Sequence, residues 1–142
     1  MKTFVVSAVS IVLVSILFCP MVMSAPPAMP ADLQIVQPDP SLPKELSAFF
    51  GKWEGLDPKF EWFLIVEKID EEKASLYWWW SGRAGDAGYI EGWRRWEGNV
   101  IKERGKYKLW YLGTFGKTEL TLKGEYLESS SRAGTLRLKR IH

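Results

Sequence analysis

Apolar and polar residues alternate with a period of two along most of the chain from Gly51 onward. The alternation is clearest in KYKLWYLG, TELTLKG and TLRLKRI, and it is typical of half-buried strands. Turn residues separate these stretches, with Ser129–Arg132 expected to be a turn and Gly124 a break within one stretch. The pattern predicts strands over Phe50–Gly55, Glu61–Ile69, Lys73–Ser81, Tyr89–Glu97, Asn99–Arg104, Lys106–Gly113, Thr118–Tyr126 and Thr135–Ile141.

No helical pattern separates these strands, which argues against parallel βαβ units. The expected fold is therefore all-β, a small antiparallel meander β-barrel of about eight strands. Closure of the sheet would remove the exposed strand edges that invite aggregation. A barrel of this size is either just filled by its own side chains or holds one small ligand, and the sequence leaves both open.

The chain before the barrel has a different composition. All eight prolines lie at or before Pro58, and all twelve glycines lie at or after Gly51. Residues 25–40 are expected to form an extended, mobile leader, because they are rich in proline. A short helix is predicted within Ser41–Phe50, capped by Ser41, so the barrel domain is placed at residues 41–142.

Residues 1–24 have the pattern of a secretory signal peptide. Lys2 precedes an apolar run that ends in small residues, which predicts cleavage after Ser24 and a secreted or periplasmic protein. The alternative is an uncleaved membrane anchor, because the run is nearly long enough to span a bilayer. Cys19, the one cysteine, lies inside this segment, so the fold is expected to have no disulfide.

Charge and residue types limit the chemistry. The chain has 19 Lys and Arg against 17 Asp and Glu, so loss of Lys2 leaves a net charge of +1 and no basic excess for nucleic acid. The one histidine is the last residue, which leaves no histidine-based triad or metal site, and no cofactor is expected. A two-carboxylate hydrolase is the remaining enzyme class, and its candidates are Glu54, Glu67, Glu91 and Glu97.

Glu67 is a special case, because it lies between Ile65 and Ile69 on a predicted strand. If these isoleucines face inward, Glu67 is buried, and a buried carboxylate needs a cationic partner. Arg94, Arg95 and Arg137 are the candidate partners. A structural ion pair is favoured over a catalytic one.

The segment Gly51-Lys52-Trp53 follows the predicted helix and opens the first strand, and in this position it resembles the G-x-W of the calycin superfamily, the lipocalin and avidin type of barrel. The resemblance covers about residues 50–141. It implies that Trp53 closes one end of the barrel under a basic residue from the last strand, here Arg137 or Arg140. The chain also resembles small bacterial secreted barrel domains, whose role is mostly unassigned.

Three consecutive tryptophans, in LYWWWSG, raise the question of function. Neighbours on a strand point to opposite faces, so Trp78 and Trp80 share one face while Tyr77 and Trp79 share the other. The set that contains Ala74 and Leu76 is more apolar and is expected to face inward. Large aromatics often simply fill a core, but eight tryptophans exceed what a small core holds, which predicts a cavity or a sticky outer surface.

The favoured function is a non-enzymatic binding module that holds a small apolar or ring-containing ligand in an aromatic barrel interior or mouth. The expected ligand-binding residues are Trp78, Trp80, Trp93, Trp110, Arg94 and Arg95. The alternative is a filled barrel that contacts an envelope protein, the cell wall or a membrane surface through outward Tyr77 and Trp79. The glycine-rich loop at 82–88 is either a mobile rim beside Trp80 or an ordinary hairpin loop.

Overall fold

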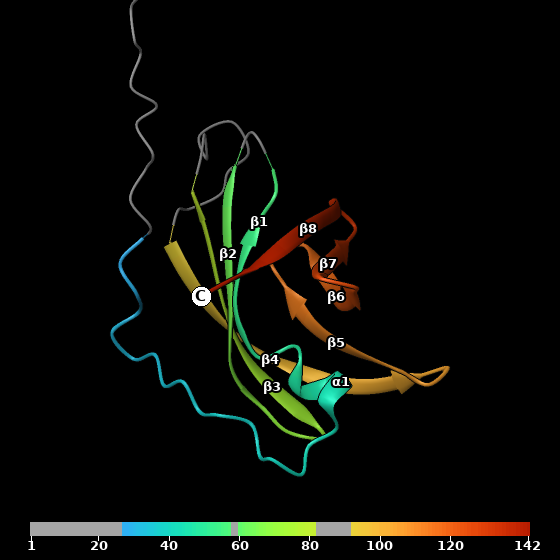
Figure 1. The fold of residues 1–142 in the computed structure, drawn as a ribbon. Coiled ribbons are helices and arrows are strands. Elements are labelled where there is room, and N and C mark those ends of the chain that lie inside the picture. Colours follow the sequence, from blue (N-terminus) through green and yellow to red (C-terminus); the bar gives the residue numbers. More distant parts are fainter. Residues whose placement is uncertain (1–26, 58–59, 82–91) are drawn as a thin grey trace, which may run out of the picture.

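The computed structural model describes residues 27–57, 60–81 and 92–142. The predicted signal peptide, the cleavage site, the 82–88 loop and Glu91 lie outside these residues. Eight antiparallel strands form a closed barrel in which each strand pairs with its neighbours in the chain and the last pairs with the first (Figure 1). The strands are β1 (Gly51–Gly55), β2 (Glu61–Ile69), β3 (Lys73–Ser81), β4 (Gly92–Glu103), β5 (Lys106–Gly113), β6 (Gly116–Lys123), β7 (Tyr126–Ser131) and β8 (Gly134–Ile141).

The predicted fold class is confirmed, but two strand boundaries were wrong. The predicted fourth and fifth strands are one strand, β4, which runs through Gly98. This glycine was interpreted as a break, yet it is buried, and a Cβ there would lie 3.3 Å from the Leu76 side chain. A glycine at this point lets the strand continue past a large neighbour.

The second error lies near the other end of the chain. The predicted seventh strand is two, β6 and β7, and the expected turn at Ser129–Arg132 is mostly the end of β7. Three consecutive serines are typical of a turn, but Ser129 is buried and pairs with Leu120 and Leu136. The turn between β6 and β7 lies at Gly124, whose φ is +62°, so the break predicted at this residue is confirmed.

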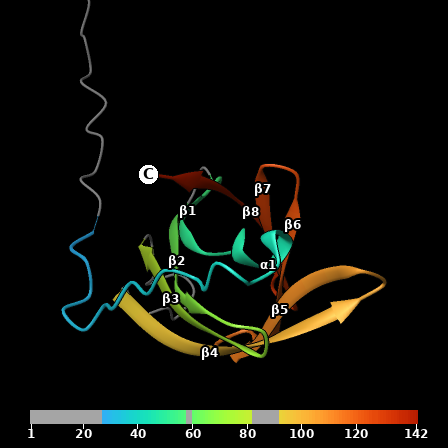
Figure 2. The same ribbon diagram turned by 60° about the horizontal axis from the view of Figure 1, so that its bottom comes forward.

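One end of the barrel is closed by the segment that precedes β1. The short helix α1 (Lys44–Ser47) lies across this end (Figure 2), and Leu42, Leu46 and Phe49 are buried in the core. The helix lies inside the range that the sequence predicts. Ser41 does not cap it, because the residue before the helix is Pro43 and the Ser41 hydroxyl donates to Asp39 instead.

The inner face of β3 is the one that the sequence predicts. Ala74, Leu76, Trp78 and Trp80 belong to the core cluster, whereas Tyr77 and Trp79 lie on the outer face. The same alternation on β4 separates Trp96, which packs against the core, from Trp93. The strands therefore sort the tryptophans between an inner and an outer aromatic group.

Candidate functional site

Arg140 covers the Trp53 ring at the end of the barrel near α1. Its guanidinium lies 4.2 Å from the centre of the Trp53 ring and donates hydrogen bonds to the carbonyls of Phe50 and Ala48. The Trp53 indole donates to the Phe49 carbonyl at 3.0 Å. Burial lowers the pKa of Arg140, but an arginine stays protonated over the whole range in which proteins fold.

Gly51 is required by this arrangement for two reasons. Its φ is +118°, a conformation that favours glycine, and a Cβ would lie 2.8 Å from Nη1 of Arg140. The basic residue expected over Trp53 is thus Arg140. The alternative, Arg137, was wrong, since it lies on the outer face of β8 opposite Glu128.

The opposite end of the barrel contains a cavity of about 260 Å³. Its walls come from the chain after β1, from β2 to β8 and from the β5–β6 and β7–β8 turns. The lining residues are Asp57, Phe60, Trp62, Trp78, Trp80, Trp96, Tyr111, Gly113, Thr114, Phe115, Thr118, Ser129, Ser131, Ala133, Gly134, Thr135 and Leu136. The interior is therefore filled near α1 and open at the far end.

Aromatic rings build the floor of this cavity. Trp62 meets Trp78 edge to face, with ring centres 6.4 Å apart, and it packs against Trp80 at 6.2 Å. Trp96 and Tyr111 form a second pair at 6.1 Å. Contacts of this kind hold each ring in place, so the floor is ordered before any ligand arrives.

Hydroxyl groups line the wall formed by the later strands. Ser129 and Thr118 are buried, while Thr114, Ser131 and Thr135 lie nearer the surface. Burial raises the pKa of Tyr111, so this hydroxyl stays neutral under ordinary conditions. An aromatic floor with a few polar groups on one side is the usual composition of a small-molecule site.

Two indole nitrogens of the floor, those of Trp62 and Trp80, are buried and have no hydrogen-bond partner. The Trp78 indole lies beside the Tyr111 hydroxyl and lowers its pKa, as a hydrogen-bond donor does. A buried donor without an acceptor costs about 1–3 kcal/mol, and most such groups in proteins are satisfied.

The structure brings only part of the predicted ligand-binding set to this cavity. Trp78 and Trp80 line it, and Arg94 lies beside it with its guanidinium 5.9 Å from the Trp80 ring. Trp93 and Trp110 do not line it, because both lie on the outer face, where Trp110 is covered by Lys117. Three inner aromatics, Trp62, Trp96 and Tyr111, were missed.

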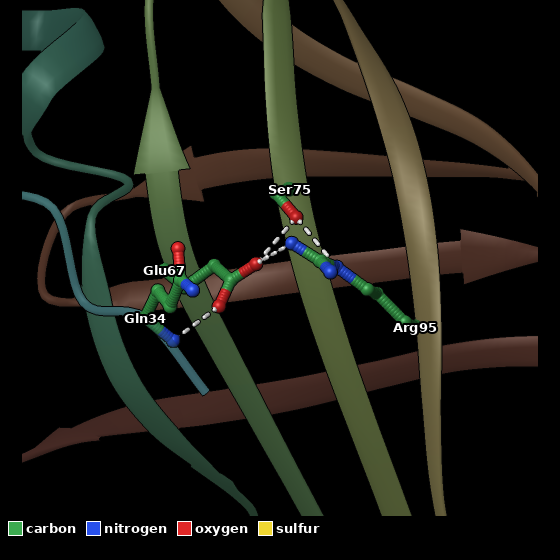
Figure 3. A network of polar contacts seen from close by, with 4 residues as sticks. All are labelled: Gln34, Glu67, Ser75 and Arg95. Carbon is green, nitrogen blue, oxygen red and sulfur yellow. Dashed lines mark hydrogen bonds and ion pairs between the residues drawn. The ribbon is translucent and has the colours of Figure 1, made fainter. Parts of the chain in front are cut away.

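Arg95 does not line the cavity, because it pairs with Glu67 on the outside of the barrel. Glu67 is only 1% exposed, and its Oε1 lies 2.5 Å from Arg95 Nη2. The Ser75 hydroxyl donates to the same oxygen, and the backbone N–H of Gln34 donates to Oε2 (Figure 3). The predicted arginine partner is confirmed, but Glu67 faces outward together with Ile65, and a bulge after Val66 turns only Ile69 back toward the core.

Gln34 belongs to a segment, residues 27–36, that we call the strap. The strap has no regular secondary structure apart from a turn at Ala31 and Asp32, and it runs along the outer face of the barrel (Figure 1). Its Val36 N–H donates to the Glu67 carbonyl at 2.8 Å, and its Ala28 carbonyl accepts from the Trp93 indole at 2.8 Å. These contacts attach the strap at two separated points of the sheet.

The strap changes the interpretation of Tyr77 and Trp79. Both point outward as predicted, yet they are only 3% and 8% exposed. Trp79 packs against Phe63 and Trp93, and Tyr77 lies under Arg95 and next to Asp32 of the strap. The expected outer aromatic surface is therefore covered by the chain itself and is not free for a partner.

The candidate carboxylates do not form a hydrolase site among the described residues. Glu54 pairs with Lys139, Glu67 pairs with Arg95, and Glu97 lies on the exposed outer face of β4. Asp57 is the one carboxylate that lines the cavity in the described part of the chain. In the same ranges, no group of three His, Cys, Asp or Glu is arranged to hold a metal ion.

Comparisons with family models, with curated proteins and with solved structures gave no match to this chain. The closed eight-strand barrel and the Arg140–Trp53 contact are compatible with the calycin resemblance, and membership of that superfamily stays a prediction. Over the residues that the structure describes, no helix has the length and hydrophobicity needed to cross a membrane.

Proposed function

We propose that this protein is a non-enzymatic binding module that holds a small ring-containing ligand in the aromatic cavity. The observation that carries the proposal is a preformed space of about 260 Å³ whose floor is made of Trp62, Trp78, Trp80, Trp96 and Tyr111. Flat aromatic walls favour flat or apolar ligands, because stacking and apolar burial both increase with shared area.

The size of the cavity limits the ligand. A volume of 260 Å³ equals that of roughly nine liquid water molecules. This matches a compound of one or two rings and is small for a long acyl chain. The signal-peptide pattern adds that such a ligand would be met in the periplasm or outside the cell.

The proposal is tested with two variants on neighbouring residues of β7. Ser129→Phe places a large side chain in the cavity, because Ser129 is buried and lines it. Ser130→Phe is the matched control, because Ser130 lies on the outer face of the same strand. Both proteins and the wild type are screened against one- and two-ring compounds by thermal unfolding and by tryptophan fluorescence.

We expect ring compounds to stabilise the wild type and Ser130→Phe but not Ser129→Phe. A compound at one hundred times its Kd adds roughly 2.7 kcal/mol to the free energy of unfolding. Equal stabilisation of Ser129→Phe would place the binding site elsewhere and would overturn the proposal.

A further inference from the structure

The unpaired indoles of the cavity differ from two indoles with a structural role. Trp53 donates its N–H to the Phe49 carbonyl, and Trp93 donates its N–H to the Ala28 carbonyl. The buried nitrogens of Trp62 and Trp80 have no acceptor, although the Trp80 side chain is only 7% exposed. Two donors without partners therefore meet at the cavity floor.

The Trp62 and Trp80 donors lie within one small region, because the centres of their rings are 6.2 Å apart. A ligand that reaches this floor and carries an acceptor oxygen could satisfy at least one of them after a small ring rotation. A hydrocarbon of the same shape would leave both unpaired, and buried donors without partners weaken binding.

The charge of the lining indicates the charge of the ligand. No Lys, Arg or His is among the described lining residues, and Asp57 is the one acid. The Arg94 guanidinium faces the Trp80 ring and donates to the Trp93 carbonyl at 3.0 Å. Among the described lining residues an anion would therefore meet no cationic partner, and the nearby Arg94 is already held against the Trp80 ring and the Trp93 carbonyl, which is unfavourable for an anion.

From these observations we infer that the cavity selects small neutral ring compounds that carry a hydrogen-bond acceptor, such as cyclic ketones, lactones or lactams. This inference rests on the proposed function and adds the chemical class of the ligand. The acceptor lies toward Trp62 and Trp80, and the rest of the ring packs on the aromatic floor.

The test uses three probes of one shape: 1-indanone, indane and indane-1-carboxylate. Indanone carries an acceptor, indane carries none, and the carboxylate is an anion. Affinities for the full chain are measured by saturation-transfer NMR and calorimetry at neutral pH. We expect indanone to bind about tenfold more tightly than indane, the effect of one buried hydrogen bond, and the carboxylate to bind more weakly than indanone.

Two variants test whether the preference for indanone over indane depends on the indole N–H groups of the cavity floor. Trp80→Phe keeps an aromatic ring but removes one N–H, so we expect the indanone-to-indane ratio to fall at least threefold. Trp62→Phe is the second test, in case the first variant does not fold. Trp110→Phe is the control, because Trp110 lies on the outer face, and it should keep the wild-type ratio.

The results with these probes distinguish a wrong ligand class from a wrong binding function. If indane binds the wild type as tightly as indanone, or the anion binds most tightly, the inference is overturned and the cavity remains a binding site. If none of the three probes binds, the inference and the proposed function are both overturned. An indanone preference that neither indole variant changes also overturns the assignment to these donors.

Discussion

Arg140 connects three parts of the closed end of the barrel with one side chain. It stacks on Trp53, donates to two carbonyls of the chain after α1, and passes so close to Gly51 that a Cβ there would lie 2.8 Å from its Nη1 and would force it to shift. Arg137, three residues earlier on the same strand, makes none of these contacts. The two arginines are therefore a matched pair for a test of what the closure contributes.

We expect Arg140→Ala to lower the free energy of unfolding by about 1–2 kcal/mol, because it removes a cation–π contact and two hydrogen bonds at the surface of the closed end. Arg137→Ala should change it by less than about 0.5 kcal/mol, as exposed substitutions usually do. Urea unfolding measures both. Equal effects would show that the closure of this end does not depend on Arg140.

Tyr77 provides a residue-scale test of the covered outer face. Its burial, together with the neighbouring Asp32 carboxylate, raises the pKa of its hydroxyl from 10.0 to about 12. The folded state thus holds this proton more tightly than the unfolded state. The resulting stability is complete below pH 10 and is lost as the pH rises from 10 toward 12.

The titration is followed by phenolate absorbance, with the Tyr77→Phe spectrum subtracted because the pKa of Tyr111 is also raised. We expect the difference to appear near pH 12 in the wild type and at lower pH in Asp32→Asn. A Tyr77 that titrates near pH 10 would mean that the outer face is open to solvent.

Among the elements, the strap differs from what the sequence pattern predicts. Proline-rich composition predicts a mobile leader, because it gives no sign that Gln34 and Val36 donate to a residue on β2. These partners are 33 and 31 residues apart in the chain, and no local pattern encodes such a contact. Only Glu67, an acid between apolar neighbours, indicated that something polar must cover this place.

Hydrogen exchange on the full chain distinguishes a docked strap from a mobile one. If the strap is docked, the amides of Gln34 and Val36 exchange at least about tenfold more slowly than unstructured amides. Glu67→Ala removes the acceptor for Gln34 but keeps the backbone carbonyl that accepts from Val36. It should therefore speed exchange at Gln34 more than at Val36, and unprotected amides in the wild type would contradict docking.

The strands show which local signals sufficed for prediction. β5 has clear alternation and β2 and β3 contain apolar runs, all three lie between turn residues, and their bounds are as predicted. β4 and β7 were misjudged because Gly98 and the serines 129–131 are turn-forming residues by type. Their actual role depends on a cross-strand neighbour, which a single sequence does not show.

At the scale of the whole molecule, alternation predicted the inner positions of Trp78 and Trp80, but it could not rank the other aromatics. The face of Trp93, Trp96 and Trp110 depends on the register of β4 and β5, and register follows from pairings across the barrel. Tyr111 and Trp110 are neighbours on β5 and lie on opposite faces, and only the register shows that Tyr111 is the inner one. The closed end was expected from the resemblance of the G-x-W segment, and the choice of Arg140 over Arg137 depends on the β1–β8 pairing, in which Arg140 lies directly opposite Trp53.

The central claim, that the cavity carries a small ligand, is tested most directly by native mass spectrometry of the full-length gene product isolated without denaturants from cells that make it. We predict a mass above that of the polypeptide by one small neutral compound, lost on denaturation, present in Ser130→Phe and absent from Ser129→Phe. A wild-type protein that shows the polypeptide mass alone, with no added mass just as in Ser129→Phe, would contradict the claim.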